Sequence, residues 1–560
     1  MPTAAAVLCA VIGAVDVADA LVHGFFTKVR WVTAYLPGAL THAAVAATTV
    51  TGILLLLLSR ALRRRKRRAW LAVVTLLAAS IGLHIVKAFD VEEAVVALVM
   101  LVALVVYRDE FYAVGDPRTR WRALGAFLGL LVIGIGLGLL LLELNAESIA
   151  SAHPFPDLLR EVLYGLVGVA GPLHFTNDRA TDLTAQVLFA LGLLTAVTTA
   201  YLLLRPAEPQ AKLEPADETR MRELLARHGR RDSLGYFALR RDKSVIFSAT
   251  GKSAIAYRVV SGVMLASGDP LGDPEAWPGA IERYLQECDR HAWTPAVVGC
   301  SQQGGEVLAR HGLDALELGD EAVLVTSEFS LEGRAMRNVR QMITRVERNG
   351  YSARARRLRD IPAAERSLIR AEASSWRGAE TERGFSMALG RFGDPADGDC
   401  VAVTAHDPQG RLRALLHFVP WGSDGLSLDL MVRDRSADPG LNEFLIVSAL
   451  RAAPELGVSE LSLNFAVFRS ALERGERLGA GFVLRAWRSV LIFLSRWFQI
   501  ESLYRFNAKF RPVWEPRFVC YRGAADLPRI AIAALEAEAF LIWPTRPFRL
   551  LRRIARVRSA

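Results

Sequence analysis

The segment "SLDLMVR" combines a carboxylate and a guanidinium with the apolar pattern of a strand. Side chains alternate between the two faces of a strand, so Asp429, Met431 and Arg433 are predicted to share one face. A carboxylate among apolar neighbours is costly unless it is paired or faces a cation. We therefore expect either a structural Asp429–Arg433 ion pair or a carboxylate that receives an ammonium group, with Glu443 and Asn464 lining the same pocket.

A second segment, "YRFNAKFRPVWEPRF", contains five aromatic and four basic side chains in fifteen positions. This composition suits a lipid surface, a stacking surface for nucleic acid or part of a reaction site. Pro512 and Pro516 exclude a continuous helix, so an extended segment is predicted. Just upstream, "LRAWRSVLIFLSRWFQI" is an apolar helix edged by arginines, a pattern typical of helices that lie against a bilayer.

The two ends of the 560-residue chain differ in composition, and the mean hydropathy of +0.24 describes neither. A formal charge of +10 suits an anionic partner, but cytoplasmic loops of membrane proteins also collect Lys and Arg. Five dispersed cysteines lack C-x-x-C pairs and nearby histidines at zinc spacing. They predict a reduced cytosolic compartment and no metal site.

Six segments of the first 204 residues are apolar and long enough to be membrane helices. They are residues 3–24, 37–58, 69–88, 91–107, 121–143 and 183–204. Basic residues gather in "SRALRRRKRR" and in the loop 108–122, which places the N-terminus and everything after residue 204 in the cytoplasm. The outer-loop segment "LLREVLYGLVGVAGPLHF" is predicted as a re-entrant or interfacial helix, with a seventh span as the alternative.

The remaining chain alternates short strands with helices, and a similar order of elements occurs twice. A mostly antiparallel sheet followed by a helix is the layout of the GCN5-related acyltransferase fold. The predicted architecture is an all-α polytopic membrane domain followed by a soluble α+β region of two tandem acyltransferase-like domains. The predicted parts are 1–204 (transmembrane), 205–218 (linker), 219–352 and 353–545 (first and second, catalytic, acyltransferase-like domains) and 546–560 (basic tail).

Several common chemistries are disfavoured by missing residues. "TGKSA" lacks the first glycine of a P-loop, and "GCSQQGG" lacks the last glycine of a nucleophile elbow. Where a coenzyme A enzyme of this fold carries a glycine-rich turn, the chain reads "RSADPG", with Asp438 in place of the first glycine. An acidic side chain there repels a pyrophosphate, so no cofactor is predicted.

Three separated stretches resemble the cytoplasmic domain of lysylphosphatidylglycerol synthases, the multiple peptide resistance factor family. They are "SLDLMVRDRSADPGLNEFLIVSAL", "LSLNFAVFRSALERGERLGAG" and "ESLYRFNAKFRPVWEPRFV", and "WRGAETERGFSMALGRFGD" and "ASGDPLGD" extend the likeness. It is closest to the actinobacterial branch and covers essentially the whole soluble half. It implies transfer of an aminoacyl group from tRNA to phosphatidylglycerol at the inner leaflet, which lowers membrane charge and gives resistance to cationic peptides.

The resemblance also implies site residues. The positions that match the family motifs are Asp429, Glu443, Glu382, Ser386, Lys509, Trp514 and Arg517. Asp429 and Glu443 are expected to bind the ammonium groups of the amino acid, and Lys509 or Arg517 to hold lipid phosphate or the oxyanion. Val432 takes the place of the family's arginine, with Arg433 one position later, which changes the pocket geometry or the amino-acid preference.

The partners implied are aminoacyl-tRNA, with lysyl-tRNA first, and phosphatidylglycerol; homo-oligomerisation is left open. No synthetase domain is present before Ala560, so charged tRNA is expected from elsewhere, and the short membrane region argues against lipid flipping. The stretch "RAMRNVRQMITRVERNGYSARARRLR" is either a tRNA surface or an ordinary solvated helix. Rival functions are another acyltransferase, using coenzyme A or aminoacyl-tRNA, and a transporter or flippase with a regulatory soluble half.

Overall fold

The computed structural model describes residues 2–23, 38–63, 65–86, 91–113, 118–146, 149, 154–176, 178–204, 208–209, 211–378, 384–467 and 500–541. The chain divides into two compact units between Glu208 and Pro209. Most of the predicted linker precedes the first helix of the second unit, α8 (Pro215–His228), which takes in the last residues assigned to that linker. The predicted bilayer-facing helix and the basic tail lie outside the described residues, apart from Ile500.

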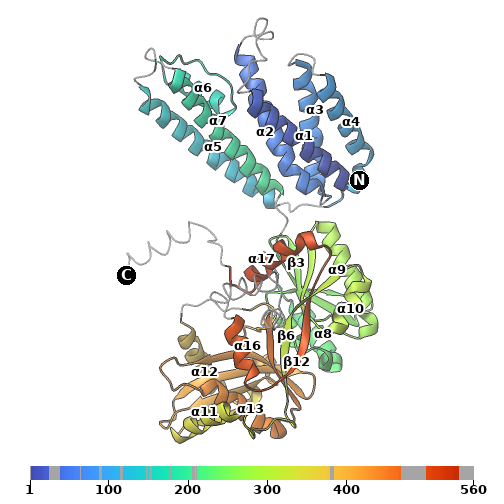
Figure 1. The fold of residues 1–560 in the computed structure, drawn as a ribbon, viewed down its shortest axis with the longest axis vertical. Helices are drawn as coiled ribbons and strands as arrows, with labels where there is room; N and C mark the ends of the chain where they lie inside the picture. Colours follow the sequence, from blue (N-terminus) through green and yellow to red (C-terminus); the bar gives the residue numbers. More distant parts are fainter. Residues whose placement is uncertain are drawn as a thin grey trace. The chain divides into compact units, whose positions relative to one another are not determined.

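The described part of the first unit is helical throughout its apolar segments (Figure 1). Its helices are α1 (Pro2–His23), α2 (Gly38–Arg63), α3 (Arg67–Val86), α4 (Val91–Val106), α5 (Arg118–Leu144), α6 (Phe155–Leu166) and α7 (Asp178–Leu204). α1 packs along α2 and α3 along α4, while α5, α6 and α7 share a core around Val162 and Leu188. Helix α7 approaches α6 so closely that a Cβ on Gly192 would lie 1.7 Å from the carbonyl oxygen of Leu166.

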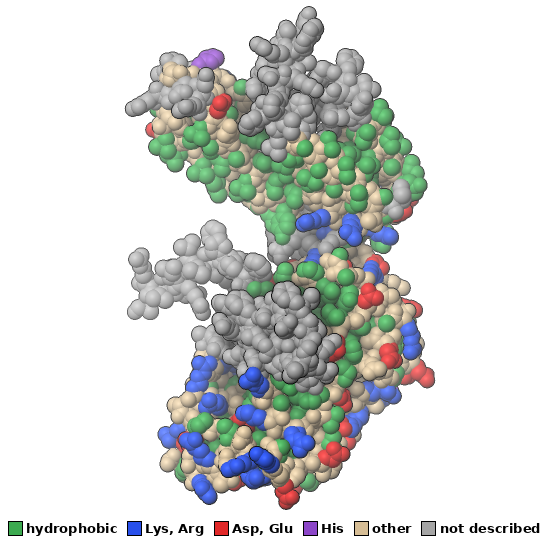
Figure 2. All heavy atoms as spheres, in the orientation of Figure 1, with side chains coloured by type: hydrophobic (Ala, Val, Ile, Leu, Met, Phe, Trp, Pro, Cys, Tyr) green, Lys and Arg blue, Asp and Glu red, His purple; other side chains and the backbone are tan. Residues whose placement is uncertain are grey.

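Two segments among the described residues are long and apolar enough to cross a membrane: Ala123–Leu144 in α5 and Ala180–Leu203 in α7. Apolar side chains cover the visible face of this unit, and Lys and Arg gather at one end of it (Figure 2). The other four predicted spans correspond to α1 to α4, and their crossing stays a prediction. The predicted outer-loop helix is present as the short helix α6.

The second unit is built on one twelve-stranded sheet (Figure 1). Its strands are β1 (Ser244–Phe247), β2 (Ser253–Val260), β3 (Val263–Ser267), β4 (Leu271–Gly272), β5 (Thr294–Cys300), β6 (Asp314–Val325), β7 (Ser352–Arg357), β8 (Val401–His406), β9 (Leu412–Trp421), β10 (Gly425–Arg433), β11 (Glu460–Val467) and β12 (Val513–Tyr521). Its other helices are α9 (Trp277–His291), α10 (Gln302–Arg310), α11 (Arg337–Arg348), α12 (Ala363–Arg377), α13 (Leu441–Leu456), α16 (Ile500–Ala508) and α17 (Leu527–Ala537).

The two halves of the sheet repeat one connection. In the first half, α9 joins β3 to the parallel strand β5; in the second, α13 joins β10 to the parallel strand β11. Parallel neighbours need such a crossover, whereas the remaining strand pairs of the sheet are antiparallel. This is the element order on which the acyltransferase prediction rested.

The last strand of each half pairs with the other half. The sheet order is β1-β2-β3-β5-β12-β6-β11-β10-β9-β8-β7, so β12 lies between β5 and β6, and β6 lies between β12 and β11. The two predicted acyltransferase-like domains, which meet at residue 352, therefore share one continuous sheet. Strand β12, "VWEPRFVCY", is a central strand, which confirms the predicted extended conformation for the second part of the aromatic and basic segment. The prediction is wrong for the first part, because residues 504–508 belong to helix α16.

Two apolar clusters cover opposite faces of the second half. One lies beneath α11 and α13, where Val339, Ile343 and Val346 of α11 recur at helical spacing. The other lies beneath α12 and includes the segment Tyr236–Leu239 from the first half. Because the strands between the clusters are buried on both faces, the few polar side chains in them need partners.

Candidate functional site

Strand β10 contains a bulge at the predicted acidic position. Its register with β9 shifts between Leu428 and Leu430, which breaks the strict alternation of side chains. Leu430 packs against the cluster beneath α12, and Met431 against the cluster beneath α11 and α13. Asp429 lies on the same side as Leu430, since its carboxylate accepts a bond from Leu389 of that cluster. The predicted shared face of Asp429 and Met431 is therefore wrong.

Asp429 is held by two groups on that side of the sheet. Its Oδ2 lies 2.6 Å from Nδ1 of His417 on β9, and its Oδ1 accepts from the backbone N–H of Leu389 at 2.5 Å. The side chains of His417 and Asp429 are only 1% and 5% exposed. The ring of Phe392 meets the imidazole edge to face at 4.9 Å. The other imidazole nitrogen, Nε2, is buried and has no hydrogen-bond partner among the described residues.

Strands β10 and β11 part next to this pair. Their parallel pairing ends at Ser427 and Ser462. Both strands continue beyond these residues, but there the edges that face each other are no longer paired. Asn464 adopts a left-handed φ of 66°, and its Nδ2 donates to the carbonyl oxygen of Leu428 across the gap. Its Oδ1 is buried without a partner in the described structure. We call this opening between the two strands the splay.

Glu443 and Lys509 form an ion pair at the start of α13. Gly440 precedes the helix with a φ of 98°, which favours glycine, and Glu443 follows in the first turn. Lys509 comes directly after α16 and donates from Nζ to Glu443 Oε1 at 2.8 Å. The carboxylate is 8% exposed, whereas the lysine side chain is 39% exposed. Two predicted site residues that are far apart in the sequence are therefore adjacent in the structure. The carboxylate is buried, and the lysine reaches solvent.

Aromatic side chains surround this pair. Trp514 lies at the start of β12, and its ring is 5.6 Å from that of Tyr504 on α16. Phe506 lies 5.2 Å beneath the Lys509 ammonium group, close enough for a cation–π contact. Trp514, Phe506 and Met431 all pack against the cluster beneath α11 and α13. Of the aromatic residues of the second sequence segment, Phe506 thus contacts the lysine, and Tyr504 and Trp514 contact each other.

The other predicted binding residues lie elsewhere. Among the described residues, Arg433 makes long contacts, at 3.5 Å, with the carbonyl oxygens of Asp434 and Ala437, and the predicted Asp429–Arg433 pair is not formed. Ser386 donates from its hydroxyl group to Glu538, just beyond α17. Glu382 lies outside the described residues.

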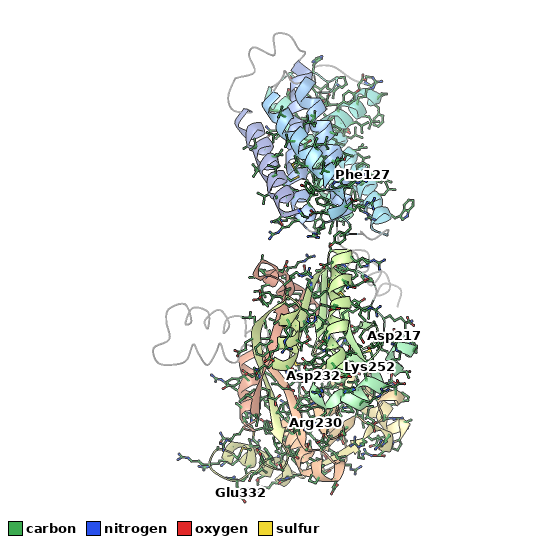
Figure 3. The ribbon with its side chains drawn as sticks, turned by 90° about the vertical axis from the view of Figure 1, so that its right-hand side faces the viewer. Phe127, Asp217, Arg230, Asp232, Lys252 and Glu332 are labelled. Atoms are coloured by element: carbon green, nitrogen blue, oxygen red, sulfur yellow. The ribbon has the colours of Figure 1, made fainter. Side chains whose placement is uncertain are left out.

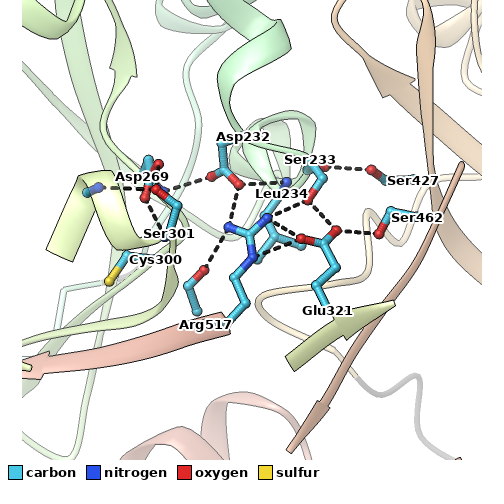
Figure 4. A network of polar contacts seen from close by, with 12 residues as sticks. Asp232, Ser233, Leu234, Asp269, Cys300, Ser301, Glu321, Ser427, Ser462 and Arg517 are labelled. Carbon is cyan, nitrogen blue, oxygen red and sulfur yellow. Dashed lines mark hydrogen bonds and ion pairs between the residues drawn. The ribbon is translucent and has the colours of Figure 1, made fainter. Parts of the chain in front are cut away.

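Arg517 lies inside a buried ion network (Figure 4). Its side chain, on β12, is 3% exposed and donates to Asp232 Oδ1 at 2.8 Å, to Glu321 Oε2 and to the hydroxyl group of Ser233 at 2.6 Å. Asp232 follows α8 in the first half (Figure 3), and Glu321 lies on β6. The guanidinium is enclosed by two carboxylates, so this geometry lends no support to a phosphate contact by Arg517.

The network extends to the last paired residues of the splay. Ser462 donates to Glu321, and the Ser427 hydroxyl group donates to the carbonyl oxygen of Ser233 at 2.7 Å. These two serines face each other where the parallel pairing ends. Arg517 therefore acts on the splay through Glu321 and Ser233, which hold the two serines in place.

A second carboxylate adjoins the network in the first half. Asp269 accepts from the N–H and hydroxyl group of Ser301 at 2.8 and 2.6 Å, and its own N–H donates to Asp232. Burial, and then repulsion from Asp232, raises the pKa of Asp269 to about 7, against the partial opposition of Arg517. Two carboxylates contact the arginine and Asp269 is a third within its electrostatic reach, so a proton on Asp269 brings the charges closer to balance.

The predicted residues thus divide between the two faces of the sheet. Asp429 lies with His417 on the α12 side, Glu443 of α13 is paired with Lys509, and Asn464 lies at the splay between β10 and β11. The described residues contain no group of three His, Cys, Asp or Glu side chains that could hold a metal ion. The Glu443–Lys509 pair suits binding of a cationic group by the acid and of an anionic group by the lysine.

The sequence reasoning missed His417, Asp232, Ser233 and Glu321. A histidine inside the apolar strand "LRALLHFVPW" was a visible signal, because a buried imidazole needs a partner. The other three residues come from segments nearly 200 or more positions before Arg517, and nothing local to them marked the network.

These features define the chain as a membrane protein with an acyltransferase-like soluble unit. Residues 222–521, more than half of the chain, match the family model described as "Phosphatidylglycerol lysyltransferase, C-terminal". The chain belongs to this family, which confirms the resemblance seen in the sequence. Residues 1–203 match the model described as "Transmembrane region of lysyl-tRNA synthetase".

Two curated relatives are the lysylphosphatidylglycerol biosynthesis bifunctional proteins of Mycobacterium avium and Rhodococcus jostii. The first is 44% identical over 492 residues and the second 43% identical over 480, each covering 85% of this chain. The chain spans only 41% and 43% of their lengths. A solved structure of L-PGS from Bacillus licheniformis is 20% identical, with a TM-score of 0.51, and covers 60% of this chain and 98% of that one. It supports the fold of the soluble unit.

Proposed function

We propose that the protein transfers an aminoacyl group, with lysyl as the first candidate, from aminoacyl-tRNA to phosphatidylglycerol. Membership of the lysyltransferase family and the relatives named for lysylphosphatidylglycerol biosynthesis support this function. The observation that carries it is the Glu443–Lys509 pair: a buried carboxylate suits an ammonium group, and a half-exposed lysine suits a phosphate or an oxyanion. The lipid product lowers negative surface charge and weakens attraction of cationic peptides.

The reaction exchanges one ester for another, so it needs no ATP. The enzyme must align the acceptor hydroxyl group of the lipid with the carbonyl carbon of the aminoacyl ester. Glu443 binds an ammonium group of the amino acid. Asp429 lies with His417 on the other side of the sheet, so the geometry lends no support to its expected contact with the same group. Asn464 offers Oδ1 at the splay, and Lys509 stabilises negative charge that develops on the carbonyl oxygen.

The membrane unit places the soluble unit at the lipid acceptor. We propose that α1, α2, α3, α4, α5 and α7 all cross the membrane, with the N-terminus and the soluble unit in the cytoplasm. The two apolar segments in α5 and α7 and the basic residues between α2 and α3 support this orientation. The headgroup of an inner-leaflet lipid then lies on the same side of the membrane as charged tRNA.

The soluble unit is proposed to consist of two tandem acyltransferase-like halves, residues 219–352 and 353–545. The repeated helix-linked parallel pairs, β3–β5 and β10–β11, support this division. The second half carries the reaction, since the open splay and the Glu443–Lys509 pair belong to it.

Helix α11 is the proposed phosphate-binding surface for tRNA. Arg337, Arg345 and Arg348 are exposed along it, and Figure 2 shows Lys and Arg over the part of the unit that contains α11 and α13. Gly440, just before α13, packs against Met342 of α11, so bound phosphates would lie close to the end of α13 that carries Glu443.

The test is transfer of label from tRNA charged with radioactive lysine, alanine or arginine to phosphatidylglycerol, using membranes that contain the full chain. We expect label in lipid with at least one amino acid, and loss of that label in Glu443→Gln. Absence of label with all three amino acids contradicts the function. Label that requires acetyl-coenzyme A in place of charged tRNA would identify the rival acyltransferase.

A further inference from the structure

Nε2 of His417 is an unusual atom for a protein interior. It is buried, it can form a hydrogen bond, and no described residue provides one. Buried polar atoms in native proteins nearly always have partners, so an exception requires an explanation. Of the described histidines, His417 is the one that is buried. The strand position alone would favour an apolar residue, since its neighbours Leu415 and Val419 on the same face are apolar core residues.

The contact with Asp429 decides which nitrogen carries the hydrogen. An ionised carboxylate only accepts, so Nδ1 donates its hydrogen to Asp429 Oδ2 across 2.6 Å. In the neutral form of the ring, Nε2 then carries a lone pair. A histidine oriented by a carboxylate on one nitrogen, with the other nitrogen free, is the arrangement that general bases need.

The position of the pair relates it to the proposed reaction site. Asp429 lies in the β10 bulge, directly after Leu428, whose carbonyl oxygen receives Asn464 across the splay. Asn464 Oδ1 is also buried without a partner in the described part of the chain. The two unpartnered atoms thus belong to side chains on β9 and β11 that bond consecutive residues of β10, Asp429 and Leu428. Each of them could be satisfied by a polar group of a bound substrate.

We propose that His417 is a catalytic residue of the transfer reaction and accepts the proton of the acceptor hydroxyl group at Nε2. The O–H bond of the lipid hydroxyl breaks as its oxygen forms a bond to the aminoacyl carbonyl carbon. The ester bond to the tRNA ribose then breaks, and the proton passes from Nε2 to the departing ribose oxygen. Asp429 keeps the Nδ1 hydrogen throughout and stabilises the transient imidazolium. This inference rests on the proposed function.

The test uses the full chain in phosphatidylglycerol-containing vesicles with labelled aminoacyl-tRNA, and it measures kcat and KM for both substrates. His417→Asn retains an N–H group that can reach Asp429 but lacks Nε2. We expect kcat to fall about 10²- to 10⁴-fold, the usual range for loss of a general base, with both KM values nearly unchanged. His406 on β8 also has a buried ring nitrogen, Nδ1, without a partner among the described residues, but β9 separates its strand from β10 and the splay. His406→Asn is therefore the matched control and should leave kcat unchanged.

His417→Gly adds a measurement that a structural role would not move. Its cavity has room for free imidazole, so its rate should rise with imidazole concentration, whereas the rate of His406→Asn should not. A His417→Asn protein with kcat close to the wild type overturns the inference alone. If His417→Asn does not fold, the imidazole response of His417→Gly decides, and no response overturns the inference. A wild-type protein that labels no lipid refutes the proposed function and this inference together.

Discussion

Each half of the sheet contains a parallel pair of strands linked by a helix, but the polar side chains at the end of the pair are bonded differently in the two halves. At the end of β3, Asp269 is fully bonded to Ser301 and adjoins the network of Arg517. At the end of the β10–β11 pairing, His417 Nε2 and Asn464 Oδ1 have no partners among the described residues. Unsatisfied polar groups are costly and persist mainly where function uses them. Under the proposed function, the first half supports the structure and the second half carries the chemistry.

Strands β6 and β12 each pair with strands of the other half, and this strand exchange links the two roles. Arg517 belongs to the last strand of the second half, yet it binds Asp232 of the first half and, through Glu321, holds Ser462 at the splay. The first half therefore fixes the point at which the splay of the second half begins. Substitutions in the network should change stability first, and substitutions at the splay should change activity first.

The largest effect is expected from Arg517→Met. Removing the guanidinium leaves Asp232 and Glu321 buried without their cation, which costs about 3–5 kcal/mol of unfolding free energy. Thermal or denaturant unfolding of the full chain in detergent measures the change. Arg433→Met is the control, because its long contacts to carbonyl oxygens predict little loss. Equal unfolding midpoints for the two variants would contradict the assigned role of the network.

Lys509→Ala should separate activity from stability. Its side chain is 39% exposed, so the fold should be retained, while loss of a charge at the oxyanion or phosphate should lower transfer about 10²-fold or more. Initial rates of lipid labelling measure the effect, and Lys252→Ala, an exposed lysine of the first half, is the control (Figure 3). Unchanged transfer in Lys509→Ala would remove the lysine from the site.

Asp269 should make the stability of the first half depend on pH. Its pKa rises from an ordinary 3.8 to about 7 in the folded protein, so the folded state holds a proton that the unfolded state releases. Stability from this group is complete below pH 3.8 and is lost as pH rises through 7, with a slope of up to about 1.4 kcal/mol per pH unit.

Unfolding midpoints of wild type and Asp269→Asn between pH 5 and pH 8 are the measurement. The variant, which cannot ionise there, should show a flatter profile. Parallel profiles for the two proteins would show that Asp269 does not retain its proton.

The smallest effect is expected on α11. Arg345→Gln and Arg348→Gln should each weaken tRNA binding a few-fold and reduce the slope of log affinity against log salt concentration by about 1, because each would lose one phosphate contact. Binding measured at several salt concentrations gives the slope, and Arg310→Gln on α10 is the control. An unchanged slope in the α11 variants would place the tRNA on another surface.

Much of the fold followed from local patterns in the chain. The six apolar runs became helices, and the order of strands and helices predicted the acyltransferase layout, because hydrophobic periodicity reports burial directly. The strand exchange did not follow, since it depends on which distant edge β12 meets. No property of "VWEPRFVCY" distinguishes a place beside β5 from one beside β11.

The site was predictable to the extent that its motifs were. Glu443 and Lys509 were both expected, and the structure brings them together. The face of Asp429 was missed because a single bulged residue reverses the alternation, and the burial of Arg517 was missed because its carboxylates lie in other parts of the chain. The sequence alone does not distinguish a charged residue that binds a ligand from one that forms an ion pair inside the protein.

The exchanged strands also set an order of events during synthesis. β6 ends at Val325 and β12 begins at Val513, so about 190 residues must be added before the gap between β5 and β6 is filled. At ribosomal speeds this takes roughly 10–40 s, during which two central strands have unpaired edges that could join other chains. A nascent chain interrupted in that interval should be a substrate for chaperones and proteases, not a partially active enzyme.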